Sequence, residues 1–122
     1  MGGDLASTLQ ELQANTAMTL VAVVGLDGLL IEGAAGPGVD LEAVAAVAAP
    51  GLVMMGDLAE ELGAGMAQVT TLEYPNHVVA MAPVNDDSLL VMVTDSGSMN
   101  LGQMRIVFRR TIGAVRDAVG EG

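Results

Sequence analysis

The segment AVAAVAAPGLVMMG, residues 43 to 56, decides the interpretation of this chain because it contains no charged residue. The chain around it is strongly acidic, with a formal net charge of -11 from 15 acidic and 4 basic residues. A helix that is apolar on every side has to be covered on every side. The segment therefore predicts a helix that packs on its own sheet with one side and on something else with another.

The ends of this helix are marked by local signals. Asp40 is a suitable N-cap, and Glu42 lies in the first turn, where a carboxylate suits the helix dipole. The helix is expected to run to about Leu62 and to end in Gly-Ala-Gly, residues 63 to 65. Pro50 removes one helical hydrogen bond, so it predicts a kink or a split. One apolar stripe runs along this helix and consists of Leu41, Val44, Ala48, Leu52, Met55, Ala59 and Leu62, and the sheet of the chain can cover one side only.

Short apolar runs on both sides of the helix predict strands. The runs at 18–25 and 29–34 flank Asp27-Gly28, a strong hairpin signal, and the Gly/Pro cluster at 33–38 predicts a loop. Further strands are expected at 66–74, 77–84 and 88–95, and amphipathic helices at 4–16 and from about Leu101. The predicted order is α-β-β-α-β-β-β-α. It indicates one α+β domain over residues 1–122, with a five-stranded, mainly antiparallel sheet.

A chain of 122 residues has few other elements that could surround the central helix. We therefore expect a homodimer in which this helix packs on its copy through Ala43, Ala46, Val47, Val53 and Met54. The strand at 66–74 is expected to pair with its own copy at a sheet edge through Val69, Thr71 and Glu73, since edge strands carry unpaired backbone groups. The alternative is a central helix buried within a single-chain core.

Composition excludes several classes of partner. The acidic field disfavours nucleic acid and anionic membrane surfaces. The chain has no Cys, so no disulfide or thiolate metal site is expected. The first ten residues lack a secretory signal pattern, and the uncharged run is too short to span a bilayer and contains Pro50-Gly51. These features predict a cytoplasmic protein without membrane insertion.

No arrangement of residues predicts catalysis, a cofactor or a metal, so we do not expect an enzyme. A P-loop requires a Lys, and the chain has none. His77 follows a Pro-Asn turn and is expected to be exposed at the start of a strand, although a catalytic His was the alternative. Turn chemistry explains Asp86, Asp87 and Asp95 better than a cation site does.

Two charged clusters have a structural and a functional interpretation. Arg105, Arg109 and Arg116 share one side of the last helix, where pairing with nearby carboxylates is expected and an arginine finger is the alternative. Asp57, Glu60 and Glu61 form either the solvated end of the central helix or an acidic surface for a partner.

Nearly all of residues 4 to 119 resembles the Roadblock/dynein light chain family. The resemblance is carried by LVAVVGLDGLLIEG (20–33), by LEAVAAVAAPGLVMMGDLAEELGAG (41–65), by LEYPNHVVAMAPVNDDSLLVMVTD (72–95) and by NLGQMRIVFRR (100–110), in this order. It implies a profilin-like or longin-like fold. It also implies homodimers in which the middle strands join two sheets and the central helices pack side by side. Bacterial members of this type partner small Ras-like GTPases.

The expected function is therefore that of a homodimeric, non-enzymatic protein that binds a small Ras-like GTPase. It would modulate GTP hydrolysis or localisation of the GTPase through its binding surface alone. The alternative function is that of a structural adaptor in a larger complex, similar to a dynein light chain, with no effect on nucleotide turnover.

Overall fold

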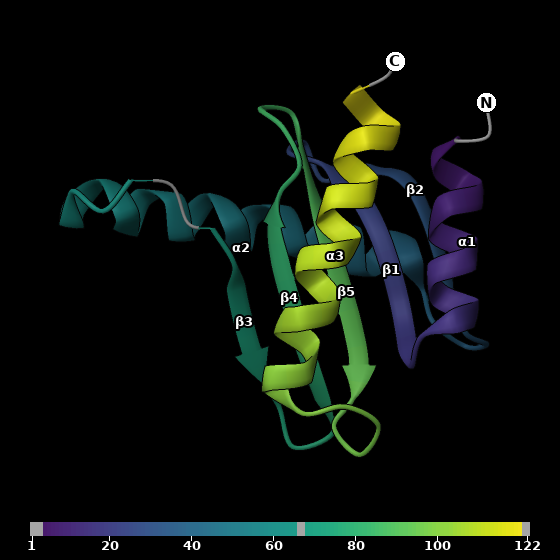
Figure 1. The fold of residues 1–122 in the computed structure, drawn as a ribbon. Coiled ribbons are helices and arrows are strands. Elements are labelled where there is room, and N and C mark those ends of the chain that lie inside the picture. The colour runs from purple at the N-terminus through teal and green to yellow at the C-terminus, as the bar shows by residue number, and fades with distance from the viewer. Residues whose placement is uncertain (1–3, 66–67, 121–122) are drawn as a thin grey trace.

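The computed structural model describes residues 4–65 and 68–120 and shows the predicted order of elements (Figure 1). The helices are α1 (Leu5–Asn15), α2 (Leu41–Leu62) and α3 (Leu101–Gly120). The strands are β1 (Met18–Gly25), β2 (Leu30–Ala35), β3 (Thr70–Glu73), β4 (His77–Pro83) and β5 (Ser88–Asp95). The α+β class with the order α-β-β-α-β-β-β-α is confirmed.

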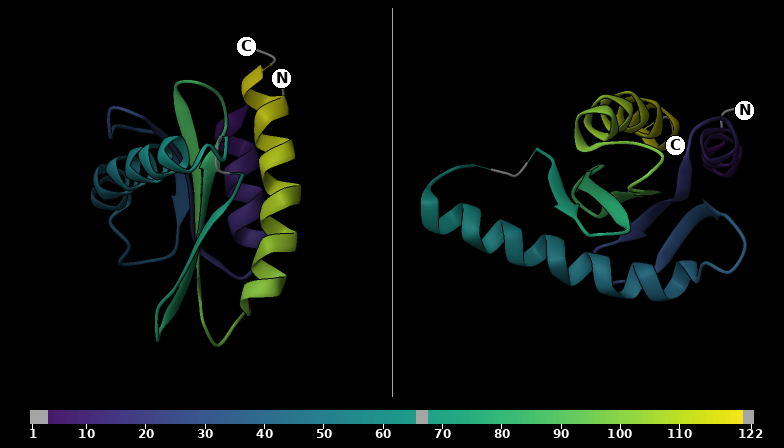
Figure 2. Two further views of the ribbon diagram at one scale, coloured as in Figure 1. Left: turned by 90° about the vertical axis from the view of Figure 1, so that its left-hand side faces the viewer. Right: turned by 90° about the horizontal axis from the view of Figure 1, so that it is seen from below.

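The five strands form one antiparallel sheet in the order β2-β1-β5-β4-β3. Strands β1 and β5 occupy the middle, and their long apolar runs are buried on both faces. The shorter β2 and β3 lie at the two edges. Helices α1 and α3 cover one face and α2 crosses the other, so the molecule has three layers (Figure 2).

Alternating side chains of the strands build two separate cores. Val21, Met92 and Val78 belong to the core beneath α1 and α3, where Phe108 is fully buried. On the other face, Leu20 and Leu89 belong to the core beneath α2. There α2 contributes mainly small side chains: Ala45, Ala48, Ala49 and Leu52. These allow close approach, and a Cβ atom on Gly33 of β2 would lie 2.9 Å from Leu41 Cδ2.

The predicted signals at the ends of α2 are present, and α1 has an N-cap of the same kind. The carboxylates of Asp4 and Asp40 accept hydrogen bonds from the backbone N–H groups of Ser7 (2.8 Å) and Ala43 (3.1 Å). Helix α2 ends at Gly63, whose φ of 63° is the left-handed conformation that glycine favours. A kink or a split was the expectation at Pro50, and of the two the split does not occur, because the helix is continuous from Leu41 to Leu62.

Two boundaries differ from the prediction because pairing partners set them. Of the strand expected at 66–74, only Thr70–Glu73 pairs with β4, and residues 66–67 lie outside the described residues. Strand β2 continues to Ala35 because Ala35 pairs with Leu20. The loop expected from residue 33 therefore begins only at Gly36.

The uncharged run of residues 43 to 56 is too short to span a bilayer, but the whole of α2 is not. With 22 residues, α2 is long and apolar enough, by length and composition alone, to cross a membrane. Its Ala45, Ala49 and Leu52 side chains are buried against the sheet of the same chain. A core helix that is mostly buried passes the same test, whereas 22% of the tested 18-residue window of α2 is buried.

Candidate docking surface

Helix α2 extends past the edge strand β3, so its C-terminal end lies beyond the sheet (Figures 1 and 2). Apolar side chains on its outer side are uncovered: Val47 is 74% exposed, Met54 64% and Leu62 69%. Val53 and Leu58 are also exposed. The chain's own elements therefore cover one side of α2 and leave an apolar strip open, as the uncharged segment predicted.

A groove of about 610 Å³ lies beside α2 over the half of the sheet that the helix does not cross. One wall is the N-terminal half of α2, including Ala43, Val44 and Val47. The floor and the far wall come from the sheet and are mostly apolar: Leu20, Leu72, Tyr74, His77, Val79, Met81, Val91 and Val93. Leu72 and Tyr74 are 40% and 54% exposed. An apolar surface of this kind marks an interaction site more often than a solvated one.

The groove ends at β3, which pairs with β4 on one side only. An edge strand presents a row of backbone N–H and C=O groups that another strand can pair with. The open helix strip, the groove and the free strand edge are therefore contiguous.

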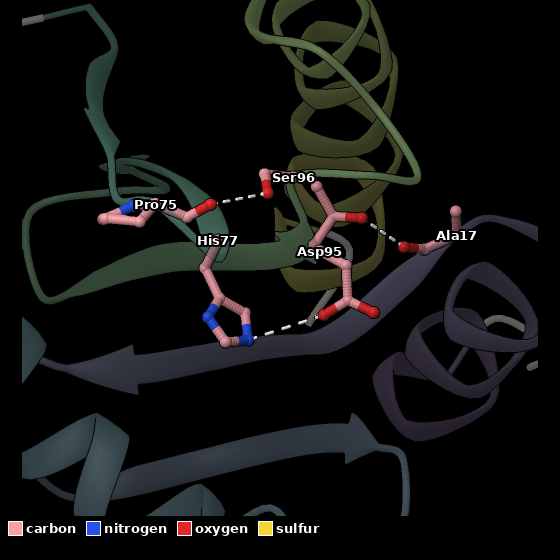
Figure 3. Close-up of polar contacts among 6 residues, drawn as sticks. Ala17, Pro75, His77, Asp95 and Ser96 are labelled. Carbon is pink, nitrogen blue, oxygen red and sulfur yellow. Dashed lines mark hydrogen bonds and ion pairs between the residues drawn. The ribbon is translucent and has the colours of Figure 1, made fainter.

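Hydrogen bonds hold the end of the groove where β4 begins and β5 ends (Figure 3). The Oγ of Ser96 donates to the carbonyl oxygen of Pro75 at 2.9 Å, and the hydroxyl of Thr94 donates to the carbonyl of Ala17. His77 is half-exposed, and its Nε2 lies 3.5 Å from Oδ1 of Asp95. His77 thus starts a strand, as predicted, and forms part of the groove wall.

The predicted interface residues fall into separate places. Ala43 and Val47 line the groove and Met54 is exposed, whereas Val53 lies on the other side of α2 from the groove. Ala46 shares the side of Val53, seven residues away, and lies next to Gly28 of the β1–β2 turn. Val69 packs against the core beneath α1 and α3, and Thr71 and Glu73 lie on β3. Asp57, Glu60 and Glu61 are exposed near the C-terminal end of α2.

The prediction that Arg105, Arg109 and Arg116 pair with carboxylates is wrong for the described part of the chain, where the one ion pair is His77–Asp95. Arg116 instead donates to the backbone carbonyls of Pro83 (2.9 Å, from Nη2) and Val84 (3.4 Å, from Nε). These carbonyls lie at the end of β4, 32 and 33 residues away in the sequence. Sequence spacing within α3 carries no information on such a contact.

Sequence reasoning missed the sheet side of the groove, above all Leu72, Tyr74, Val79 and Val93. The alternation of Leu72 and Tyr74 with Thr71 and Glu73 was a usable signal for an apolar face of β3. The other two side chains come from strands that are buried elsewhere along their length. Their exposure depends on where α2 crosses the sheet.

These features define a class of protein. It has a three-layer α/β/α fold around an antiparallel sheet, and one of its helices is covered by the chain on one side and open on the other. A model of the Roadblock/LC7 domain family matches residues 5–94. The chain therefore belongs to the Roadblock/LC7 family. A sequence comparison with curated proteins found no match.

Solved structures show the same fold. MglB from Myxococcus xanthus superposes with a TM-score of 0.85 at 20% identity, over 96% of this chain and 95% of that one. An MglB with a tetrameric arrangement superposes with a TM-score of 0.80 at 19% identity, over 93% of this chain and 86% of that one. Profilin IA from Acanthamoeba castellanii gives 0.60 at 18% identity, over 92% and 96%. The predicted profilin-like, Roadblock-type fold is confirmed.

Proposed function

We propose that this protein is a cytoplasmic homodimer that binds a small Ras-like GTPase and regulates its GTP hydrolysis or its localisation. The single observation that carries the proposal is the uncovered apolar strip of α2 beside an apolar groove and a free strand edge. Family membership and the likeness to MglB support a GTPase as the partner, as the resemblance of the sequence implied.

The geometry favours one way of dimerising. Consider a two-fold axis perpendicular to the sheet and beside β3, which pairs β3 with its copy in antiparallel fashion. Both copies of α2 then lie on the same side of the joined sheet. Since α2 crosses one half of its sheet and extends past β3, each copy would reach over the half that the other leaves open. That half is the groove of Leu72, Val79 and Val93.

This arrangement uses the predicted residues in two ways. Ala43, Val47 and Met54 would pack between the helices, and Thr71 and Glu73 would lie in the paired strands. Ala46 would stay on the far side of α2, next to Gly28 of the β1–β2 turn. Asp57, Glu60 and Glu61 would stay at the surface of the joined helices, where carboxylates attract a basic partner. The dimer would act on the GTPase by binding it and holding its conformation.

The dimer is tested by sedimentation velocity on the purified chain and on three variants. Val47→Glu and Met54→Glu place a carboxylate on the open strip, and Ile31→Glu places one at the opposite sheet edge, where Ile31 is 51% exposed. The native chain and the Ile31→Glu variant should give a mass twice the 12.3 kDa of one chain. The Val47→Glu and Met54→Glu variants should give the mass of a monomer. A native chain that stays monomeric at high concentration, or Val47→Glu and Met54→Glu variants that stay dimeric, would overturn this dimer.

The partner is tested with the small Ras-like GTPase encoded closest to this gene, loaded with GTP or GDP. Binding with faster hydrolysis supports regulation of turnover. Binding without a change in rate supports the scaffolding form of the function and the adaptor alternative. If the native dimer bound the GTPase in neither nucleotide state, the GTPase proposal would be contradicted. The proposed dimer would not be affected by that result.

A further inference from the structure

A second, smaller hollow lies on the other side of α2 from the groove. We call it the turn hollow, because two hairpin turns and α2 enclose a space of about 190 Å³. Its lining residues are Leu26 of the β1–β2 turn, Leu52, Val53 and Gly56 of α2, and Pro83, Asn85 and Asp86 at the β4–β5 turn. It opens to solvent, since Leu26 is 40% and Val53 48% exposed.

The rim of the turn hollow is held in place without any partner. The N–H of Leu26 donates to the carbonyl oxygen of Asp87 at 3.0 Å, which ties the two turns together. The Asn85 side-chain oxygen accepts hydrogen bonds from the N–H of Asp87 at 2.8 Å and from the Oγ of Ser88 at 2.9 Å. A preformed hollow binds with a smaller loss of conformational entropy than a mobile one.

The size and lining of the turn hollow suit one apolar side chain. A dry cavity of about 150 Å³ accommodates benzene, so this space accommodates a side chain of the size of Leu or Phe. Leu26, Leu52 and Val53 provide apolar contacts for it. Burying such a side chain stabilises a complex by about 1.5–3 kcal/mol before the losses of association.

Four carboxylates belong to the elements that enclose the turn hollow, and one cation lies close to it, since Arg116 donates to the backbone carbonyls of Pro83 and Val84. Asp86 lines it, Asp87 and Asp27 belong to the two turns, and Asp57 follows Gly56 on α2. The other three basic residues of the chain, Arg105, Arg109 and Arg110, also lie on α3, which covers the opposite face of the sheet. The rim is therefore negative, and it complements a positively charged partner.

The charge also argues against a second copy of this chain at the turn hollow. A two-fold contact there would bring the same acidic surface of two copies together, and like charges repel. The proposed dimer uses the groove on the other side of α2 and leaves the turn hollow accessible.

We propose that the turn hollow is an anchor site for a partner protein that inserts one apolar side chain flanked by Lys or Arg. This proposal rests on the proposed function for the existence of a protein partner. The chemistry of the partner's inserted segment follows from the turn hollow alone. It assigns Val53 to partner binding rather than to the dimer.

The test uses the full ¹⁵N-labelled chain and three capped peptides, with binding followed by amide chemical shifts. Arg-Lys-Leu-Lys-Arg should shift the amides of Leu26, Val53, Gly56 and Asn85. Arg-Lys-Ser-Lys-Arg should bind at least about fivefold more weakly, because the apolar contribution is lost. Glu-Glu-Leu-Glu-Glu should not bind at the same low salt concentration.

Matched charge variants complete the test. The double variant Asp86→Asn/Asp87→Asn should weaken the first peptide about fivefold, since two exposed charge contacts are removed. The control Glu11→Gln/Asp117→Asn loses the same net charge at exposed positions of α1 and α3 and should bind like the native chain. Equal effects of both variants, or equal binding of the Leu and Ser peptides, would overturn the anchor site. If the peptide bound at the turn hollow and the GTPase did not bind the protein, the anchor site would be supported. Only the proposal that the partner is a GTPase would be contradicted.

Discussion

His77 and Asp95 are direct partners across β4 and β5, and the His77 Nε2 lies 3.5 Å from the Asp95 Oδ1 (Figure 3). Both side chains are open to solvent, with 45% and 64% exposure. Exposed ion pairs of this kind contribute little to folding. His77→Gln should therefore change the free energy of unfolding by less than about 1 kcal/mol, measured by urea denaturation. A loss well above this value would show that the pair is structurally essential.

The same position should matter for self-association, because His77 lines the groove that the partner helix would cover. His77→Glu places a second carboxylate beside Asp95 and should weaken the dimer in sedimentation equilibrium. Asn76→Glu adds the same charge in the exposed turn just before β4 and serves as the control. An identical dissociation constant for both variants would argue that the groove is not part of the interface.

Phe108 is fully buried in the core beneath α1 and α3. Phe108→Ala removes the largest of the fully buried side chains and should cost about 3–5 kcal/mol of stability. Ile106 lies on the same helix and is 58% exposed, so Ile106→Ala should change stability by no more than about 0.5 kcal/mol. Thermal or urea unfolding of the two variants measures this contrast, and similar losses would contradict the packing described.

Pro50 lies inside α2 without interrupting it. A proline in a helix interior removes one hydrogen bond and crowds the carbonyl four residues before it, here that of Ala46. Pro50→Ala should therefore stabilise the chain by about 1–2 kcal/mol in urea unfolding. Pro37→Ala, in the exposed loop between β2 and α2, should bring no such gain. A destabilised Pro50→Ala variant would show that the native packing of α2 requires the proline.

The N-cap of α1 predicts an acid dependence of stability. The hydrogen bond from the backbone N–H of Ser7 holds the pKa of Asp4 below its usual value of 3.8. A lowered folded-state pKa contributes stability that is present above pH 3.8 and is lost as the pH falls through the folded pKa. In urea unfolding, any stability advantage of the native chain over Asp4→Asn should therefore shrink on acidification below this value. A difference that grows with acid would contradict the assignment of Asp4 as the cap.

Local sequence signals predicted most of the fold. The runs that form β1 and β5 match the predicted strands at both ends, because each is a continuous apolar segment bounded by turn residues. Asp40 and Gly63 mark the ends of α2 for reasons that act within one helical turn. By contrast, β3 and the end of β2 depend on how far a neighbouring strand extends, which the local pattern does not contain.

The candidate site divides in the same way. By itself, the uncharged segment determined that α2 has more apolar surface than one sheet can cover, because helical periodicity assigns its side chains to all sides. The tertiary structure alone decided which side stays open, because that depends on where α2 crosses the sheet and passes β3. It also separated Val47 from Val53, and it brought Leu26 and Asp87 within hydrogen-bond distance to form the turn hollow. Such contacts join residues far apart in the chain, and their geometry exists only once the sheet has formed.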